Sequence, residues 1–154
     1  MEYYFAKWLH ILSSTLLFGT GLGSAYYMFF ASLSRDARAV AMVVRFVVRA
    51  DWWFTTPTIV FQPLSGFYMM HLAGFPFSSP WIAWSIALYL LAGVCWLPVV
   101  WMQIRMADMA RQAAERQEAL PRRYWQFLGL WTALGVVAFL ALVAVFWLMV
   151  AKPS

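Results

Sequence analysis

Charged residues are scarce in this sequence. Of its 154 residues, 11% are charged and 64% are hydrophobic, whereas a soluble domain usually carries about 25% charged residues. The single cysteine, Cys95, leaves no disulfide to form within the chain. The sequence also has no glycine-rich phosphate loop and no CxxC motif, the usual signatures of nucleotide-binding and thiol-redox proteins. The scarcity of charge argues against a soluble globular domain and favours a membrane protein, and the missing motifs argue against nucleotide binding and thiol redox chemistry.

Carboxylates are missing from the middle of every long hydrophobic run. Asp51 and Asp108 are predicted at the inner ends of such runs or beyond them. A proton-coupled transporter usually needs such a carboxylate within the membrane, and a hydrolase triad needs a carboxylate close to its histidine. The sequence predicts neither arrangement.

Long hydrophobic runs are what the sequence has in abundance. Four of them, approximately residues 4–30, 52–72, 81–105 and 124–150, reach the about 20 residues that a helix needs to cross about 30 Å of hydrocarbon. A helix satisfies its own backbone hydrogen bonds where water is absent. The sequence therefore predicts an all-α membrane protein: an antiparallel four-helix transmembrane bundle with cytoplasmic helical extensions. Residues 1–154 are expected to form a single integral membrane domain.

The positions of the basic residues predict the orientation in the membrane. Four arginines lie between the first two runs and five between the last two or at their ends, while the connection around residues 75–80 has none. Because basic loops stay in the cytoplasm, we expect both termini outside, in the periplasm if the membrane is the inner membrane of a bacterium. This placement explains the formal charge of +5 without a nucleic-acid partner.

The connecting segments have helical patterns of their own. Ser34 is a candidate N-cap for an amphipathic helix over Arg35–Ala50. The polar segment Arg105–Leu120 is expected to continue the third helix into the cytoplasm, until Pro121 breaks it. On the outer side, Ser79-Pro80 is typical of an N-cap followed by proline at the first helical position.

The only two histidines, His10 and His71, both lie inside hydrophobic runs, where an ionisable group is a functional candidate by default. The predicted topology places them at similar depth in the outer half of adjacent antiparallel helices. Ser14 and Gly21 share the helix face of His10, and Phe67 shares that of His71. Two facing imidazoles are the usual axial ligands of b-type haem. We therefore predict a haem b site with its iron held by His10 and His71.

Two other interpretations of the histidines stay open. Each imidazole could simply hydrogen-bond a neighbouring helix or lie in the wet interface. Copper is a further candidate, because Met69 and Met70 next to His71 supply soft ligands. It is the less favoured metal, since both methionines point to different faces of a regular helix from His71.

Gln62 and Pro63 form a separate polar feature near the middle of the second run. Proline removes a backbone hydrogen bond and frees the carbonyl of Ile59. Gln62 lies nearly opposite His71, on one face with Thr55. This stripe of Gln62, Pro63 and Thr55 could line the path of a small molecule, or Pro63 could be a structural kink with Gln62 bonded to another helix.

Several short motifs resemble those of a known family. They are Trp8-Leu9-His10-Ile11-Leu12, Phe18-Gly19-Thr20-Gly21, Gln62-Pro63-Leu64-Ser65-Gly66, Pro80-Trp81, Cys95-Trp96-Leu97-Pro98 and Gln103-Ile104-Arg105-Met106. With them the chain resembles a bacterial family of predicted integral membrane proteins of unknown function. A more distant likeness, carried by Leu9-His10-Ile11 and Gly21, is to the HemJ-type protoporphyrinogen oxidase and the copper-resistance D-type membrane domain, which implies a haem ligand role for His10. The HemJ-type pattern has a basic residue where this chain has Tyr26-Tyr27-Met28.

Three functions follow from these patterns. The first is a b-type haem-binding redox protein or subunit with its site near the outer face. The second is a non-enzymatic accessory or assembly subunit of a membrane complex. The third is a small carrier or quinone-interacting protein that works through the Gln62–Pro63 stripe. The expected partners are the lipid bilayer, a membrane redox partner or quinone, and further subunits of a homo- or hetero-oligomer.

Overall fold

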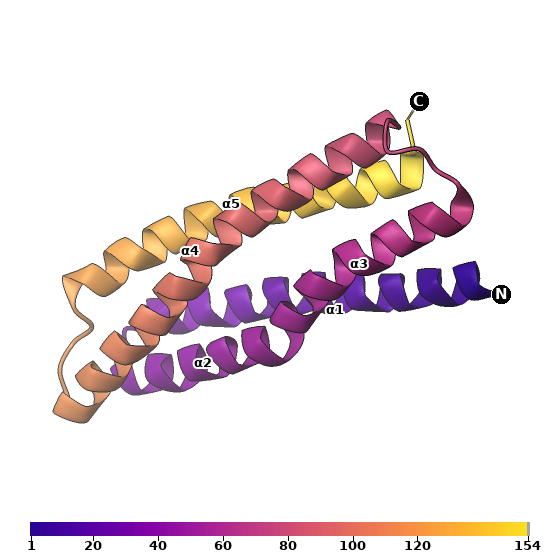
Figure 1. The fold of residues 1–154 in the computed structure, drawn as a ribbon. Helices are drawn as coiled ribbons and strands as arrows, with labels where there is room; N and C mark the ends of the chain where they lie inside the picture. Colours follow the sequence, from indigo (N-terminus) through magenta and orange to yellow (C-terminus); the bar gives the residue numbers. More distant parts are fainter. Residues whose placement is uncertain (154) are drawn as a thin grey trace.

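The computed structural model describes residues 1–153 and consists of helices joined by short connections (Figure 1). In chain order the elements are α1 (Glu2–Leu33), α2 (Ala37–Ala50), the π-helix η1 (Asp51–Thr55), α3 (Thr56–Ala73), α4 (Pro80–Arg116) and α5 (Arg122–Ala151). The predicted all-α class is therefore confirmed for the described residues. The predicted spans lie within α1, η1 with α3, α4 and α5.

The helices form two hairpins that pack together at one end (Figure 1). In the first, α1 runs out and α2, η1 and α3 return along it as one bent rod; in the second, α4 and α5 lie antiparallel. The hairpins contact each other mainly where α2 packs on α4. Both termini lie at the opposite end of the molecule from the α4–α5 connection (Figure 1), which agrees with an even number of passes.

The hydrophobic core lies at the end where the hairpins meet. It includes Met28 of α1, Val44 of α2, Met106 of α4 and Tyr124 of α5, all fully buried. Ser32 and Tyr124 add a buried hydrogen bond of 2.7 Å between α1 and α5. Burial of these large side chains from four helices fixes the crossing of the hairpins at this end.

Three helices are long and apolar enough to cross a membrane among the described residues: α1, α4 and α5. The helix α3 is not one of them, although the sequence predicts a span at residues 52–72. It has 18 residues, and Thr58, Gln62, Ser65 and His71 lower its hydropathy. The predicted membrane character is thus supported by three helices, and a fourth crossing by α3 stays a prediction.

The connections differ from expectation at the start of α2 and at the end of α4. Ser34 ends α1, where its hydroxyl donates to the Ala31 carbonyl at 2.6 Å. Asp36, not Ser34, is the N-cap of α2, because its carboxylate accepts from the Arg38 N–H at 2.9 Å. The start of α4 at Pro80 after Ser79 is confirmed, and α5 begins directly after Pro121. The helix α4 ends at Arg116 and not at Leu120 as predicted, because Gln117 takes a left-handed conformation with φ 56° before Pro121 is reached.

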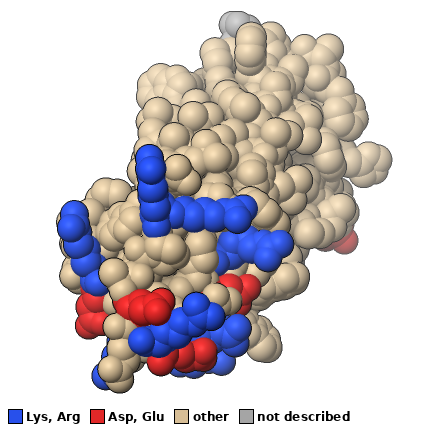
Figure 2. Space-filling model, turned by 90° about the vertical axis from the view of Figure 1, so that its left-hand side faces the viewer, with Lys and Arg blue, Asp and Glu red and all other residues tan. Residues whose placement is uncertain are grey.

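Charged side chains gather at one end of the molecule. Figure 2, which looks toward the end where α4 meets α5, shows basic and acidic side chains crowded in its lower half, while the surface above them has almost none. Exposed apolar side chains cover the remainder, among them Leu16, Val94 and Leu140. A water-facing surface would not expose so many large apolar groups, so this pattern favours a membrane around the uncharged part.

The carbonyl that Pro63 frees has found a partner on another helix. Pro63 lies inside α3 and cannot donate to the carbonyl of Ile59. Tyr89 of α4 donates its hydroxyl to that carbonyl at 2.7 Å. The kink in α3 is therefore tied to the second hairpin, in a region where the two hairpins have few other contacts.

This hydrogen bond gives a stability prediction. We expect Tyr89→Phe to lower the free energy of unfolding by about 1–2 kcal/mol, because a polar carbonyl loses its partner in an apolar setting. In a Pro63→Ala background the loss should be smaller, since the alanine backbone supplies an N–H that can donate to the Ile59 carbonyl. Unfolding in detergent micelles, followed by circular dichroism, measures all four proteins of this cycle. Equal losses in both backgrounds would contradict the assigned pairing.

Candidate functional site

The side of α3 that faces into the protein is polar, and the side that faces out is apolar. The buried polar side chains follow one another at spacings of four, three, four and three residues along η1 and α3. They are Asp51, Thr55, Thr58, Gln62 and Ser65. We call this set the polar face of α3. Val60, Leu64 and Phe67 are exposed on the other sides, so the helix is the reverse of a water-soluble amphipathic helix.

Hydroxyl groups on the polar face donate their protons within their own helix. Thr58 donates to the carbonyl of Phe54 at 2.7 Å, and Ser65 donates to that of Phe61 at 2.7 Å. A hydroxyl has one proton and two lone pairs. The hydroxyl oxygens therefore remain available as acceptors toward the adjacent helix α1.

His10 of α1 lies against the outer end of the polar face. Its Nδ1 is 2.7 Å from the Ser65 hydroxyl oxygen, and its Cε1 would lie 3.6 Å from a Cβ placed on Gly66. The absence of a side chain at Gly66 lets the imidazole ring approach the backbone of α3. No hydrogen bond to Nε2 is found among residues 1–153, so one ring nitrogen is held and the other is free.

Gln62 completes the contact between the two helices. In the amide orientation that satisfies its neighbours, its nitrogen donates to His10 Nδ1 at 3.1 Å and to the His10 carbonyl at 3.2 Å, while its oxygen accepts from the Ser14 N–H at 3.2 Å. Gln62 and Ser65 are each 8% exposed. The amide thus binds both the imidazole and the helical turn that carries it.

This arrangement suits both neutral forms of the imidazole. When Nδ1 carries the proton, it donates to the Ser65 oxygen; when Nδ1 is bare, it accepts from the Gln62 amide. A neutral imidazole must have one donor and one acceptor nitrogen. Since the site offers a partner in each case, a proton can enter at one ring nitrogen and leave at the other with no loss of hydrogen bonding at Nδ1.

The structure brings some of the predicted site residues together and leaves others apart. Gln62 contacts His10, and the backbone N–H of Ser14 donates to the Gln62 amide oxygen. The hydroxyl of Ser14 donates to the Ile11 carbonyl. Thr55 is buried further along the polar face and pairs with Asp51. Gly21 is exposed and has nothing within 4 Å of a Cβ built on it.

His71 does not join His10 within one chain. It is exposed and lies nine residues after Gln62, which on a regular helix is the opposite face. It also lies six residues beyond Ser65, about 9 Å nearer the helix end at 1.5 Å per residue. Phe67 lies on the same outward side and is exposed. The centroid of its ring is 6.0 Å from that of Phe77. On a regular helix this register separates His71 from the contacts of His10, and a haem site shared by the two histidines stays a prediction.

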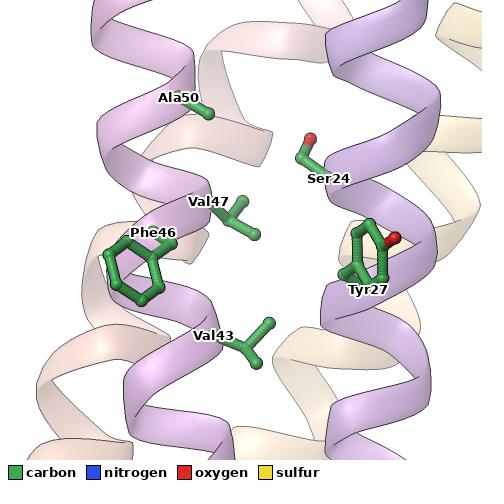
Figure 3. A pocket seen from close by; sticks show the side chains of 6 residues that line it. All are labelled: Ser24, Tyr27, Val43, Phe46, Val47 and Ala50. Carbon is green, nitrogen blue, oxygen red and sulfur yellow. The ribbon is translucent and has the colours of Figure 1, made fainter.

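An open groove between α1 and α2 offers no comparable chemistry. It holds about 290 Å³ between α1 and α2, and Figure 3 shows its lining side chains converging from both helices. They are Ser24, Tyr27, Val43, Phe46, Val47 and Ala50. Its surface is almost wholly apolar, and in the described residues no three His, Cys, Asp or Glu side chains gather to hold a metal ion.

Sequence reasoning missed Ser65 and Asp51 as site residues. Ser65 appears only within a family motif, and Asp51 was assigned to the inner end of a helix. The signal that identifies both is their register with Thr55, Thr58 and Gln62, since a 4-3-4-3 spacing keeps side chains on one face of a helix.

Fold and site together define a helical integral membrane protein with a polar helix face buried inside it. Residues 4–153 match the family described as predicted integral membrane protein (DUF2269), and the chain belongs to this family. The family resemblance predicted from the motifs is thereby confirmed, whereas the likeness to the HemJ-type oxidase and the copper-resistance D-type domain is not. Comparisons with curated proteins and with solved structures found no match.

Proposed function

We propose that this protein is a small membrane carrier module that moves protons along the polar face of α3 and exchanges them at His10. The observation that carries the proposal is the contact of His10 with Ser65 and Gln62. Ionisable and polar groups are costly inside a membrane and mark ion pathways and proton relays when they occur there. The proposal develops the predicted carrier function of the Gln62–Pro63 stripe.

The spacing of the polar face suits a proton path. Residues three or four apart on a helix have their Cβ atoms about 5–6 Å apart, so their polar groups can bond directly, as Thr55 and Asp51 do, or through one water with hydrogen bonds of about 2.8 Å on each side. Thr55, Thr58, Gln62 and Ser65 follow this spacing without interruption. Water molecules between them would form a chain that ends on the imidazole.

The proposed orientation follows from the charges. We place α3 across the inner membrane of a bacterium as a fourth span, with both termini outside and the charged end of the molecule (Figure 2) in the cytoplasm. His10 then lies eight residues into α1, about 12 Å from its outer end. The proton path would run from the cytoplasmic end of the polar face to this depth.

Proton flux into liposomes tests the proposal. Purified protein reconstituted with an internal pH dye and driven by a potassium diffusion potential should acidify or alkalise the lumen faster than empty liposomes. We expect His10→Ala and Gln62→Leu each to reduce the rate at least tenfold, because either change interrupts the path. Thr132→Val, on α5 and away from the polar face, is the matched control and should keep the wild-type rate.

Two results would contradict the proposal. One is a rate no higher than that of empty liposomes when the reconstituted protein is folded. The other is a wild-type rate in both His10→Ala and Gln62→Leu.

A redox subunit with haem b is the second candidate, and one observation favours it. Haem-ligating histidines have one nitrogen hydrogen-bonded by the protein and the other free for iron, as His10 has. The contact of His10 with α3 leaves no room for a porphyrin between α1 and α3. Within one chain the haem would therefore lie on another side of α1, with a second axial ligand other than His71.

Absorption spectroscopy tests this candidate. A reduced-minus-oxidised spectrum of protein produced with sufficient haem should show Soret and α bands, and His10→Ala should abolish them. His71→Ala should leave them, since His71 lies on the outward side of α3. A spectrum without either band rules out the haem candidate, including the site predicted from both histidines.

A further inference from the structure

A buried carboxylate lies at the other end of the polar face. Asp51 begins the π-helix η1 and is 5% exposed. The Thr55 hydroxyl donates to its Oδ1 at 2.8 Å, and the side chain of Gln103 on α4 is near enough to act on the pKa of the same carboxyl. Isolated π-helical turns occur frequently at functional sites, and here the turn holds the only acidic residue among the buried polar ones that the structure describes.

One oxygen beside this carboxylate is left without a partner. Gln103 is 4% exposed, and its Oε1 is buried without a hydrogen bond. Since the Gln103 side chain acts on the pKa of Asp51, the unpaired oxygen belongs to the same cluster. A buried acceptor without a donor costs about 1–3 kcal/mol, so its position next to a carboxyl calls for a proton or a water molecule that the carboxyl can share.

No basic side chain neutralises Asp51. The ion pair in the described part of the chain joins Arg111 to Asp108. The helix η1 packs against α1, α2 and α3, and Gln103 brings α4 to it. The ionisable groups of these elements nearest in the chain are Arg49, Arg105 and the pair Tyr26 and Tyr27, all exposed; α3 has none before Tyr68.

A carboxylate in this setting favours its neutral form. Burial raises the pKa of Asp51 above its usual range, while the hydrogen bonds from Thr55 and Gln103 act in the opposite direction. Ionised carboxylates are buried at high cost unless a cation pairs with them. A carboxyl group that keeps its proton avoids this cost and gains a donor for a neighbouring oxygen.

We propose that Asp51 is a proton-binding site that stays protonated at neutral pH and forms the cytoplasmic end of the polar face. The neutral acid gives its proton to a water molecule next to Thr55, which becomes hydronium, and the carboxylate remains. Hydronium from the cytoplasm then returns a proton to the carboxylate and leaves water, so that charge and atoms balance over a cycle. The direction of transfer toward His10 rests on the proposed function, whereas the protonated state of Asp51 does not.

Infrared spectroscopy of the full-length protein in lipid nanodiscs tests the proposal. At pH 7 the wild type should show the C=O stretching band of a protonated carboxyl group, and the band should disappear as the pH is raised. For an ordinary aspartate, with a pKa of about 3.9, the carboxylate outnumbers the carboxylic acid by about a thousand to one at pH 7. Asp51→Asn should remove the band, and Asp108→Asn, at the half-buried partner of Arg111, should keep it.

Isotope labelling keeps the test independent of variants. Carbon-13 at the aspartate side-chain carboxyl should shift the band in the wild-type protein, even if Asp51→Asn does not fold. Absence at pH 7 of a carboxyl band that responds to this label overturns the proposal. A labelled band in a protein without proton flux in liposomes leaves Asp51 as a proton-binding site and contradicts the proposed carrier function instead.

Discussion

The central constraint on this structure is the burial of polar groups in a protein whose surroundings are apolar. In lipid, a polar side chain that faces outward has no water to bind. The five members of the polar face therefore turn toward the interior, and the outward sides of α3 carry Val60, Leu64 and Phe67. The contacts of Gln62 and Ser65 with His10 determine how α1 and α3 pack.

The same constraint accounts for the irregularities of the backbone near the site. Pro63 leaves the Ile59 carbonyl free, and Tyr89 of α4 satisfies it. The π-helical turn at Asp51–Thr55 joins α2 to α3 without a break in the rod, and Gln103 of α4 is near enough to Asp51 to act on its pKa. Each irregularity thus lies where the bent rod of α2, η1 and α3 approaches the second hairpin. The contacts of His10 with Gln62 and Ser65, in contrast, join α1 and α3 within the first hairpin.

The sequence predicted the helices well because each long hydrophobic run gives a strong periodic signal and because Pro80 and Pro121 determine where α4 and α5 begin. The prediction of Ser34 as the N-cap of α2 was wrong. Asp36, two residues later, takes this position because its carboxylate accepts from the Arg38 N–H. The freed carbonyl of Ile59 followed from proline chemistry, but its partner Tyr89 depends on how two hairpins pack. Local sequence carries no information on that contact.

The site was predicted in part. His10, Gln62 and Thr55 belong to the polar contact, whereas His71 is exposed. A hydrophobic run specifies the depth of a residue along a helix much better than the side of the helix on which it lies. The buried polar side chains show which side of the helix faces the interior of the protein. The 4-3-4-3 register of Asp51, Thr55, Thr58, Gln62 and Ser65 selects one inward face, and His71 is not on it. For a membrane helix the buried polar register is a better guide to a site than the pairing of rare residues.

Solid-state NMR of the protein in lipid bilayers tests the contact between α1 and α3 most directly. With histidine and serine labelled, a cross-peak should join the imidazole ring of His10 to the side chain of Ser65, and Ser65→Ala should remove it. The spectrum should show no contact between the two imidazole rings of one chain. A cross-peak between His10 and His71 in protein diluted with unlabelled copies, with none to Ser65, would contradict the buried polar face as the basis of the site.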